Sequence, residues 1–119
     1  MIIDHSEYFS RKELQCHCGC GQCLMDSDFM NDIDWIREAV GQPLGVNSGY
    51  RCKAYDATLN NDDNHPRGLA IDLAAPTDQL KWKIFIAALS RHFNRFGFAK
   101  TFIHLDKVLV HPPEVIWIY

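Results

Sequence analysis

Two histidines and one aspartate stand where the surrounding sequence is otherwise apolar. Asp72 interrupts the run GLAIDL, His104 interrupts TFIHLDK, and His65 lies shortly before the first of these segments. A carboxylate in an apolar strand is costly to bury unless a cation or several hydrogen-bond donors satisfy it. Two imidazoles and one carboxylate are also the protein ligands of an open, catalytic zinc site, in which water takes the fourth position.

A metal is one of two interpretations that these residue types allow. A histidine in a strand is commonly a hydrogen-bonded core residue, and an aspartate before a turn commonly caps neighbouring backbone. The local pattern by itself leaves both interpretations open.

Four of the five cysteines lie in the segment CHCGCGQC, and the fifth, Cys52, is distant in sequence. An odd number fits poorly with a complete disulfide framework. Three alternatives remain, namely a second, structural metal, a disulfide such as one between this segment and Cys52, and reduced thiols. The metal is the least favoured, because the paired CxxC knuckles of a zinc finger are absent and the ligands would crowd. Its candidate ligands are Cys16, Cys18, Cys20 and Cys23, with His17 as a further donor.

The helices that must position these residues follow from capping signals and hydrophobic spacing. A Ser followed three residues later by Glu forms a capping box and predicts a short helical turn over 10–15. Apolar residues at helical spacing predict a longer helix over 26–40, and a second long helix begins at Pro76 and Thr77.

The remaining segments are predicted to be strands, turns and one loop. Strands are expected at 68–73, 101–105 and 115–118, and the segment LGVNSGY is partly β-prone. The stretch from Lys53 to Arg67, with its run NNDDN, predicts a loop, and Gly97 predicts a turn. Since no βαβ repeat is present, we expect an α+β fold with a small, mainly antiparallel sheet and two main helices.

Length and composition exclude several classes of protein. The 119 residues suit one domain over 1–119, and an apolar fraction of 47% is enough for a core. The formal charge is −3 and the basic residues are scattered, so we expect no nucleic-acid partner. No apolar run approaches the roughly 18 residues of a membrane span, and the N-terminus lacks the pattern of a secretion signal. We therefore expect a soluble monomer that is cytoplasmic as synthesised.

Several motifs resemble those of the D-alanyl-D-alanine carboxypeptidase family of zinc peptidases. They are SGYRC at 48–52, HPRGLAID at 65–72 and HLD at 104–106, of which His-x-x-Gly-x-Ala-x-Asp is the most specific. The opening segment YFSRKELQCHCGC also resembles a short branch of this family that is common in phages and prophages. The family includes murein endopeptidases, phage endolysins among them, and it shares a metal fold with the hedgehog signalling domain.

The resemblance implies roles for individual residues. His65, Asp72 and His104 match the zinc ligands of the family. Arg51 matches an arginine that faces the substrate carboxylate or the developing oxyanion, which a guanidinium suits because it forms two parallel hydrogen bonds. The alternative for Arg51 is a surface ion pair. Ser48 either caps the turn or donates a hydrogen bond to the substrate.

The chain departs from the family pattern at two points. Where the family usually has Ser-x-His, Asp63 stands two residues before His65, so it either replaces the missing hydroxyl or repels a carboxylate. The acid or histidine that serves several branches as general base is also absent, since Thr101 and Phe102 occupy its positions. Asp106 is the best substitute, either as a proton acceptor or as a group that orients a ligand.

The resemblance thus implies a metallopeptidase with one catalytic Zn2+ that hydrolyses peptidoglycan stem peptides at bonds involving D-amino acids. A carboxypeptidase or a murein endopeptidase would fit, encoded by a phage or prophage for cell-wall lysis. Two other classes are kept as alternatives. One is a metal-containing binding module of the same fold without hydrolysis, and the other is a small interaction module built on the cysteine cluster.

Overall fold

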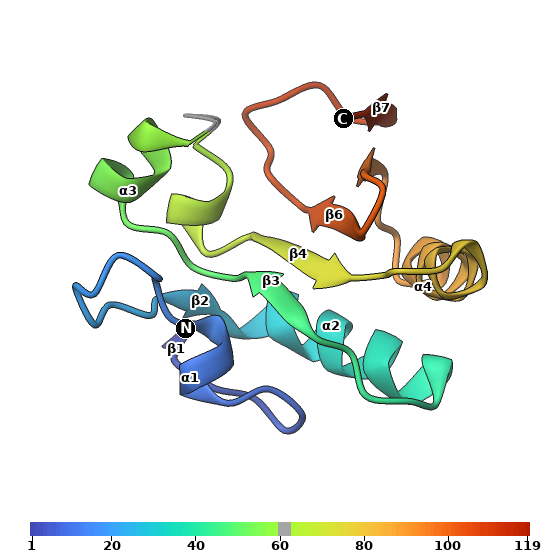
Figure 1. The fold of residues 1–119 in the computed structure, drawn as a ribbon, viewed down its shortest axis with the longest axis horizontal. Coiled ribbons are helices and arrows are strands. Elements are labelled where there is room, and N and C mark those ends of the chain that lie inside the picture. The colour runs from blue at the N-terminus through green and yellow to red at the C-terminus, as the bar shows by residue number, and fades with distance from the viewer. Residues whose placement is uncertain (60–62) are drawn as a thin grey trace.

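The computed structural model describes residues 1–59 and 63–119 (Figure 1). Among these residues, the main sheet has five strands in the order β3-β4-β6-β5-β7. The strands are β3 Val46–Ser48, β4 Ala70–Ala74, β5 Arg95–Phe98, β6 Phe102–Asp106 and β7 Val115–Ile118. All neighbours are antiparallel except β5 and β7, which run parallel. Strands β1 Ile2–Ile3 and β2 Met25–Asp26 form a small separate sheet.

Two long helices, α2 Ser27–Val40 and α4 Asp78–Ser90, pack on one face of the main sheet (Figure 1). Side chains of β4 and β6 that alternate along each strand enter the core on this face, and they are Ile71, Leu73, Ile103 and Leu105. Asp26 caps α2 by accepting a hydrogen bond from the N–H of Phe29, and the hydroxyl of Thr77 caps α4 in the same way. The two helices thus cover the apolar face of the main sheet, and the polar side chains of β4 and β6 lie on the opposite face.

The expected fold class is confirmed, with a small, mainly antiparallel sheet and two main helices. The short helix α1 Arg11–Leu14 begins at Ser10, where the predicted capping box with Glu13 is present. The strands predicted near 68–73, 101–105 and 115–118 are β4, β6 and β7. No helix in the described ranges has the length and apolar character required to cross a bilayer.

The loop predicted from Lys53 to Arg67 is wrong in part. The structure has helix α3 over Lys53–Thr58 and a 3₁₀ turn, η1, over His65–Arg67. Buried Asp56 of α3 pairs with Arg51, a contact outside the helix that the local pattern does not show. Part of the Asn and Asp run, residues 60–62, lies outside the described residues.

Gly97 was expected in a turn, but it lies inside strand β5. Its lack of a side chain has a tertiary cause, because a Cβ at this position would lie 2.5 Å from Nε1 of Trp117. A glycine in a strand often marks such a close approach. The ring of Trp117, on the neighbouring strand β7, occupies the space that a side chain would need.

Candidate metal centre

The register of the sheet aligns the polar residues in one row on the face away from the long helices. Ser48 pairs with Asp72, Asp72 with His104, His104 with Gly97, and Gly97 with Trp117. Paired residues of neighbouring strands carry their side chains on the same face of a sheet. Residues that are far apart in sequence thus become neighbours across four strand pairs.

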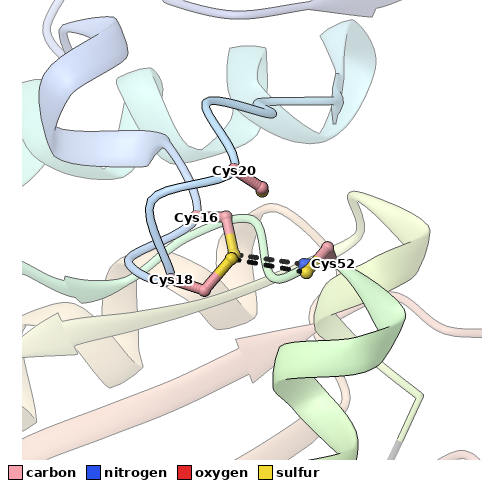
Figure 2. A group of neighbouring side chains, drawn as sticks. All are labelled: Cys16, Cys18, Cys20 and Cys52. Carbon is pink, nitrogen blue, oxygen red and sulfur yellow. Dashed lines mark hydrogen bonds between the residues drawn. The ribbon is translucent and has the colours of Figure 1, made fainter.

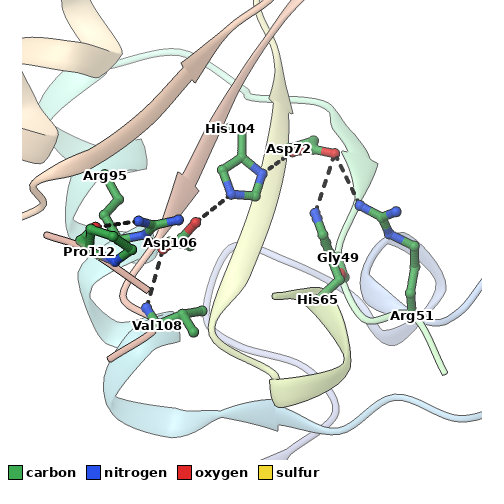
Figure 3. A network of polar contacts seen from close by, with 9 residues as sticks. All are labelled: Gly49, Arg51, His65, Asp72, Arg95, His104, Asp106, Val108 and Pro112. Atoms are coloured by element: carbon green, nitrogen blue, oxygen red, sulfur yellow. Dashed lines mark hydrogen bonds and ion pairs between the residues drawn. The ribbon is translucent and has the colours of Figure 1, made fainter. Parts of the chain in front are cut away.

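His65, Asp72 and His104 converge at this row, and their ligand atoms all lie within 4.8 Å of one another (Figure 3). Nδ1 of His104 is 2.8 Å from Oδ1 of Asp72, and Nε2 of His65 is 3.5 Å from Oδ2 of the same carboxylate. All three residues are buried. Ligands at about 2 Å from a tetrahedral zinc ion are themselves roughly 3.3 Å apart. The separation between His65 and Asp72 suits a shared ion, and the shorter hydrogen bond between His104 and Asp72 would lengthen to admit one.

The orientation of His65 leaves a lone pair directed at this point. Nδ1 lies 2.7 Å from the carbonyl oxygen of Gly49, and because a carbonyl only accepts, Nδ1 carries the hydrogen. Nε2 then presents its lone pair, and it is buried with no hydrogen-bond partner among the described residues. Buried nitrogen atoms seldom lack a hydrogen-bond partner. A metal ion bound here would supply a partner for Nε2 of His65. The donor set therefore fits zinc.

His104 lies between two carboxylates, with Nδ1 toward Asp72 and Nε2 2.7 Å from Oδ2 of Asp106. The carboxylate of Asp106 also accepts hydrogen bonds from Nε of Arg95 at 2.6 Å and from the N–H of Val108 at 3.2 Å. Asp106 is fully buried. A carboxylate that accepts from the far nitrogen of a ligand histidine fixes the orientation of its ring.

The charges of this cluster support one another. Burial alone would raise the pKa of Asp72, but the hydrogen bond with His104 and the close contact with His65 hold that pKa well below its usual range. Burial alone would lower the pKa of His104, but Asp106 and Asp72 raise it to about 9. The pKa of Asp106 is likewise lowered, by His104 and Arg95 against the opposing effect of burial. The two carboxylates beside His104 thus favour positive charge at this ring.

Arg51 is buried beside this cluster, where NH2 lies 3.8 Å from Oδ2 of Asp72 and NH1 lies 3.2 Å from Oδ1 of Asp56. The surface ion pair considered as an alternative is wrong, because both members of the pair with Asp56 are buried. Arg51, Asp72, Ser48 and His17 line one pocket. A cation and a hydroxyl therefore stand next to the candidate ligands, on the wall of a cavity.

The structure shows where the residues lie at which the chain departs from the family pattern. The carboxylate of Asp63 forms an ion pair with Arg67 at 2.7 Å, and its substrate role stays a prediction. Thr101 is exposed before β6, and the ring of Phe102 packs against Tyr119 with centroids 5.1 Å apart. Neither of these side chains supplies an acid.

Sequence reasoning missed three groups that shape the site. Arg95 anchors Asp106, the carbonyl of Gly49 holds His65, and the ring of Trp117 lies 5.2 Å from that of His104. Arg95 carried a usable signal, since it is a charged residue in the apolar segment FNRFGF. The other two carried none, because one acts through its backbone and the other through strand pairing.

The second group of candidate ligands differs from the predicted set. Cys16, Cys18, Cys20 and Cys52 gather with all four sulfur atoms within 4.8 Å of one another (Figure 2). The inclusion of Cys23 was wrong, because its buried thiol lies 3.5 Å from the carbonyl oxygen of Asp4 instead. All five cysteines are free thiols in the structure.

The fold and the convergent donors define a class, an α+β protein with a candidate mononuclear metal centre beside a pocket. Comparison with known families refines this class. The sequence model of the family described as Peptidase M15 matches residues 7–106, and the chain belongs to this family of zinc D-Ala-D-Ala carboxypeptidases. Peptidases of this family use zinc. No curated protein and no solved structure shows a significant match to the chain.

Proposed function

We propose that this chain is a zinc metallopeptidase that hydrolyses peptidoglycan stem peptides at bonds involving D-amino acids. The observation that carries the proposal is the buried Nε2 of His65, which has no hydrogen-bond partner and points at the ligand atoms of Asp72 and His104. Membership of a zinc peptidase family agrees with this interpretation. The resemblance of SGYRC and HPRGLAID to the family motifs supports the choice of D-amino acid substrates.

The protein residues have separate tasks in this proposal. His65, Asp72 and His104 hold the ion, while the carbonyl of Gly49 and the carboxylate of Asp106 fix the two rings. When bound, zinc supplies Lewis acidity toward a scissile carbonyl and toward water. Asp72 and His104 lie on paired strands and His65 lies in the turn η1, and all three are buried, so they need little rearrangement to accept the ion.

Substrate binding is assigned to the pocket wall. The guanidinium of Arg51 lines the pocket and can hold a terminal carboxylate or a developing oxyanion through paired hydrogen bonds. The hydroxyl of Ser48 lines the same pocket and can donate a hydrogen bond to the peptide. Asp63 is proposed to contact the substrate only at the edge of the pocket, since Arg67 already neutralises its charge.

Asp106 is proposed to orient His104 rather than to accept a proton from water. Both of its oxygens are engaged, one by His104 and one by Arg95, and no part of the residue reaches solvent. This burial also favours the second candidate function, a metal-containing binding module, because it removes the best substitute for the general base. A role in cell-wall lysis for a phage or prophage rests on the resemblance of the opening segment.

The deciding experiment incubates the zinc-loaded chain with two muropeptides, one ending in D-Ala-D-Ala and one cross-linked, and weighs the products by mass spectrometry. We expect either loss of one D-Ala or separation of the cross-linked stems, which distinguishes carboxypeptidase from endopeptidase. His65→Ala should abolish both cleavage and zinc binding at this centre. His5→Ala is the matched control, because His5 is exposed and its Nδ1 pairs with the neighbouring Asp4.

The same experiment separates the alternatives. If both muropeptides bind to the zinc-loaded chain and neither is cut, the binding module replaces the enzyme. If neither is bound nor cut while zinc is present, the substrate class is wrong. Cleavage that survives in His65→Ala would remove the metal centre from the chemistry.

A further inference from the structure

A second cluster of ligand atoms lies outside the candidate metal centre (Figure 2). Cys16, Cys18 and Cys20 come from the loop after α1, and Cys52 is the residue that precedes α3. The Sγ atoms of Cys16 and Cys18 are 3.5 Å apart, and those of Cys18 and Cys52 are 3.7 Å apart. Loop and helix therefore meet through sulfur atoms, although 34 positions separate Cys18 from Cys52.

These separations match a metal site better than a disulfide. Sulfur atoms bonded to each other are about 2.0 Å apart. Four thiolates at about 2.3 Å from a tetrahedral zinc ion are roughly 3.8 Å from one another. The measured values of 3.5 and 3.7 Å lie close to the second distance, and all four sulfur atoms share one neighbourhood.

The backbone around the cluster is arranged to hold such an ion. Gly19 and Gly21 have positive φ values of 91° and 77°, which let the loop turn sharply between the cysteines. The N–H of Cys16 donates to the carbonyl of Gln22 at 2.9 Å and closes the loop. The N–H of Cys52 donates to Sγ of Cys16 at 3.4 Å, a contact that stabilises negative charge on sulfur.

We propose that Cys16, Cys18, Cys20 and Cys52 bind a second zinc ion, and that this ion has a structural role. Four protein ligands complete a tetrahedral shell and leave no position for substrate, as in other structural zinc sites. Cys23 takes no part, since its Sγ lies against the carbonyl oxygen of Asp4 and outside the group formed by the other four sulfur atoms. The inference stands on the cysteine geometry and does not depend on the proposed peptidase activity.

The position of this second ion gives it a task. Cys52 follows Arg51 directly, and Gly49, which holds His65, lies three residues before Cys52. The two segments already touch, because the N–H of Tyr50 donates to the carbonyl of Leu14 at 2.8 Å. A zinc ion bound here would fasten the cysteine loop, with His17 on it, to the segment that carries Arg51 on the pocket wall.

Metal content and cobalt spectra test this inference on the intact 119-residue chain. Protein purified under reducing conditions with zinc should hold two ions per chain. Cys18→Ser should hold one, and Cys23→Ser, the matched control, should keep two. After exchange into cobalt, the wild type and His65→Ala should both show intense thiolate-to-cobalt charge-transfer bands, and Cys18→Ser should lack them.

Three results would overturn the inference. One is a single zinc ion per wild-type chain that is lost with His65→Ala. Another is the absence of thiolate-to-cobalt bands in the wild type, a measurement that holds even if the serine variant does not fold. The third is a disulfide joining Cys18 and Cys52 in reduced preparations, found by mass spectrometry of peptides. Loss of muropeptide cleavage alone would leave this inference intact and bear only on the proposed function.

Discussion

At the scale of single residues, the centre depends on how one imidazole is held between two carboxylates. His104 contacts Asp72 through Nδ1 and Asp106 through Nε2, and Arg95 balances the second carboxylate. An imidazole fixed in this way presents Nδ1 to an ion without losing rotational freedom at the moment of binding. The contacts run from Asp72 through His104 and Asp106 to Arg95. Asp106 therefore acts through His104, as a residue that positions its ring.

Asp106→Asn tests this role at the residue scale. The amide keeps the shape of the side chain but loses the charge that His104 and Arg95 require. We expect zinc affinity to fall about 10–100-fold, with turnover recovering at saturating zinc. Competition with a chelating dye measures the affinity, and turnover is followed on the muropeptide as zinc is titrated.

The control for this substitution is Asp32→Asn, because Asp32 lies on α2 and pairs with Arg91 and Lys107 rather than with a candidate ligand. It should leave zinc affinity unchanged. Unchanged affinity in Asp106→Asn together with lost turnover would instead assign direct proton transfer to Asp106.

At the scale of elements, strand register assembles the site. Asp72 of β4 and His104 of β6 are direct partners, and Gly97 of β5 continues the row toward Trp117 of β7. A shift of one residue between β4 and β6 would turn a ligand toward the long helices. The parallel strand β7 matters because it brings an aromatic ring beside His104.

Gly97→Ala tests the role of strand β7. The new Cβ would lie 2.5 Å from Nε1 of Trp117, so the ring must move away from His104. We expect a loss of about 1–3 kcal/mol in the free energy of unfolding, together with a red shift of Trp117 fluorescence. Urea unfolding and emission spectra measure both in a background where Trp35 and Trp82 are replaced by phenylalanine.

Gly45→Ala is the control, since its added Cβ would meet Cβ of Ala74 at 3.3 Å, a contact that small shifts relieve. Its effect on stability should be clearly smaller, with no change in Trp117 emission. Equal losses of stability in the two variants would show that the position of Trp117 does not depend on the missing side chain at Gly97.

At the scale of the whole molecule, buried charge and metal binding are connected. Positive and negative side chains form one buried network on the side of the sheet away from the long helices (Figure 3). Its members are Arg51, Asp72, Arg95, His104 and Asp106. A ligand that binds only the folded chain stabilises it by mass action. Zinc at a centre of this kind is therefore expected to contribute to folding as well as to chemistry.

Removal of zinc tests this expectation. At free zinc about a thousandfold above its Kd, one site adds about 4 kcal/mol to the free energy of unfolding. A strong chelator should thus lower the unfolding midpoint of the wild type in urea, and added zinc should restore it. In His65→Ala the drop should be smaller, because one site has been lost before the chelator is added. Equal drops in the two proteins would show that the His65 centre does not stabilise the fold.

The amino-acid sequence by itself determined the ligand types and most of the elements. Asp72 and His104 are visible as polar interruptions of apolar strands, and the capping box at Ser10 is a local signal that the structure repeats. The motifs HPRGLAID and HLD carry the family likeness in the same way, because they are short and continuous.

Only the tertiary structure decided which distant residues meet. Cys52 rather than Cys23 joins the cysteine cluster, Arg95 balances Asp106, and Gly97 lies in a strand beneath Trp117. Each of these facts depends on strand register or on contacts between remote segments, to which local spacing is insensitive. The sequence thus names the donors, and the packing of the chain determines which of them converge.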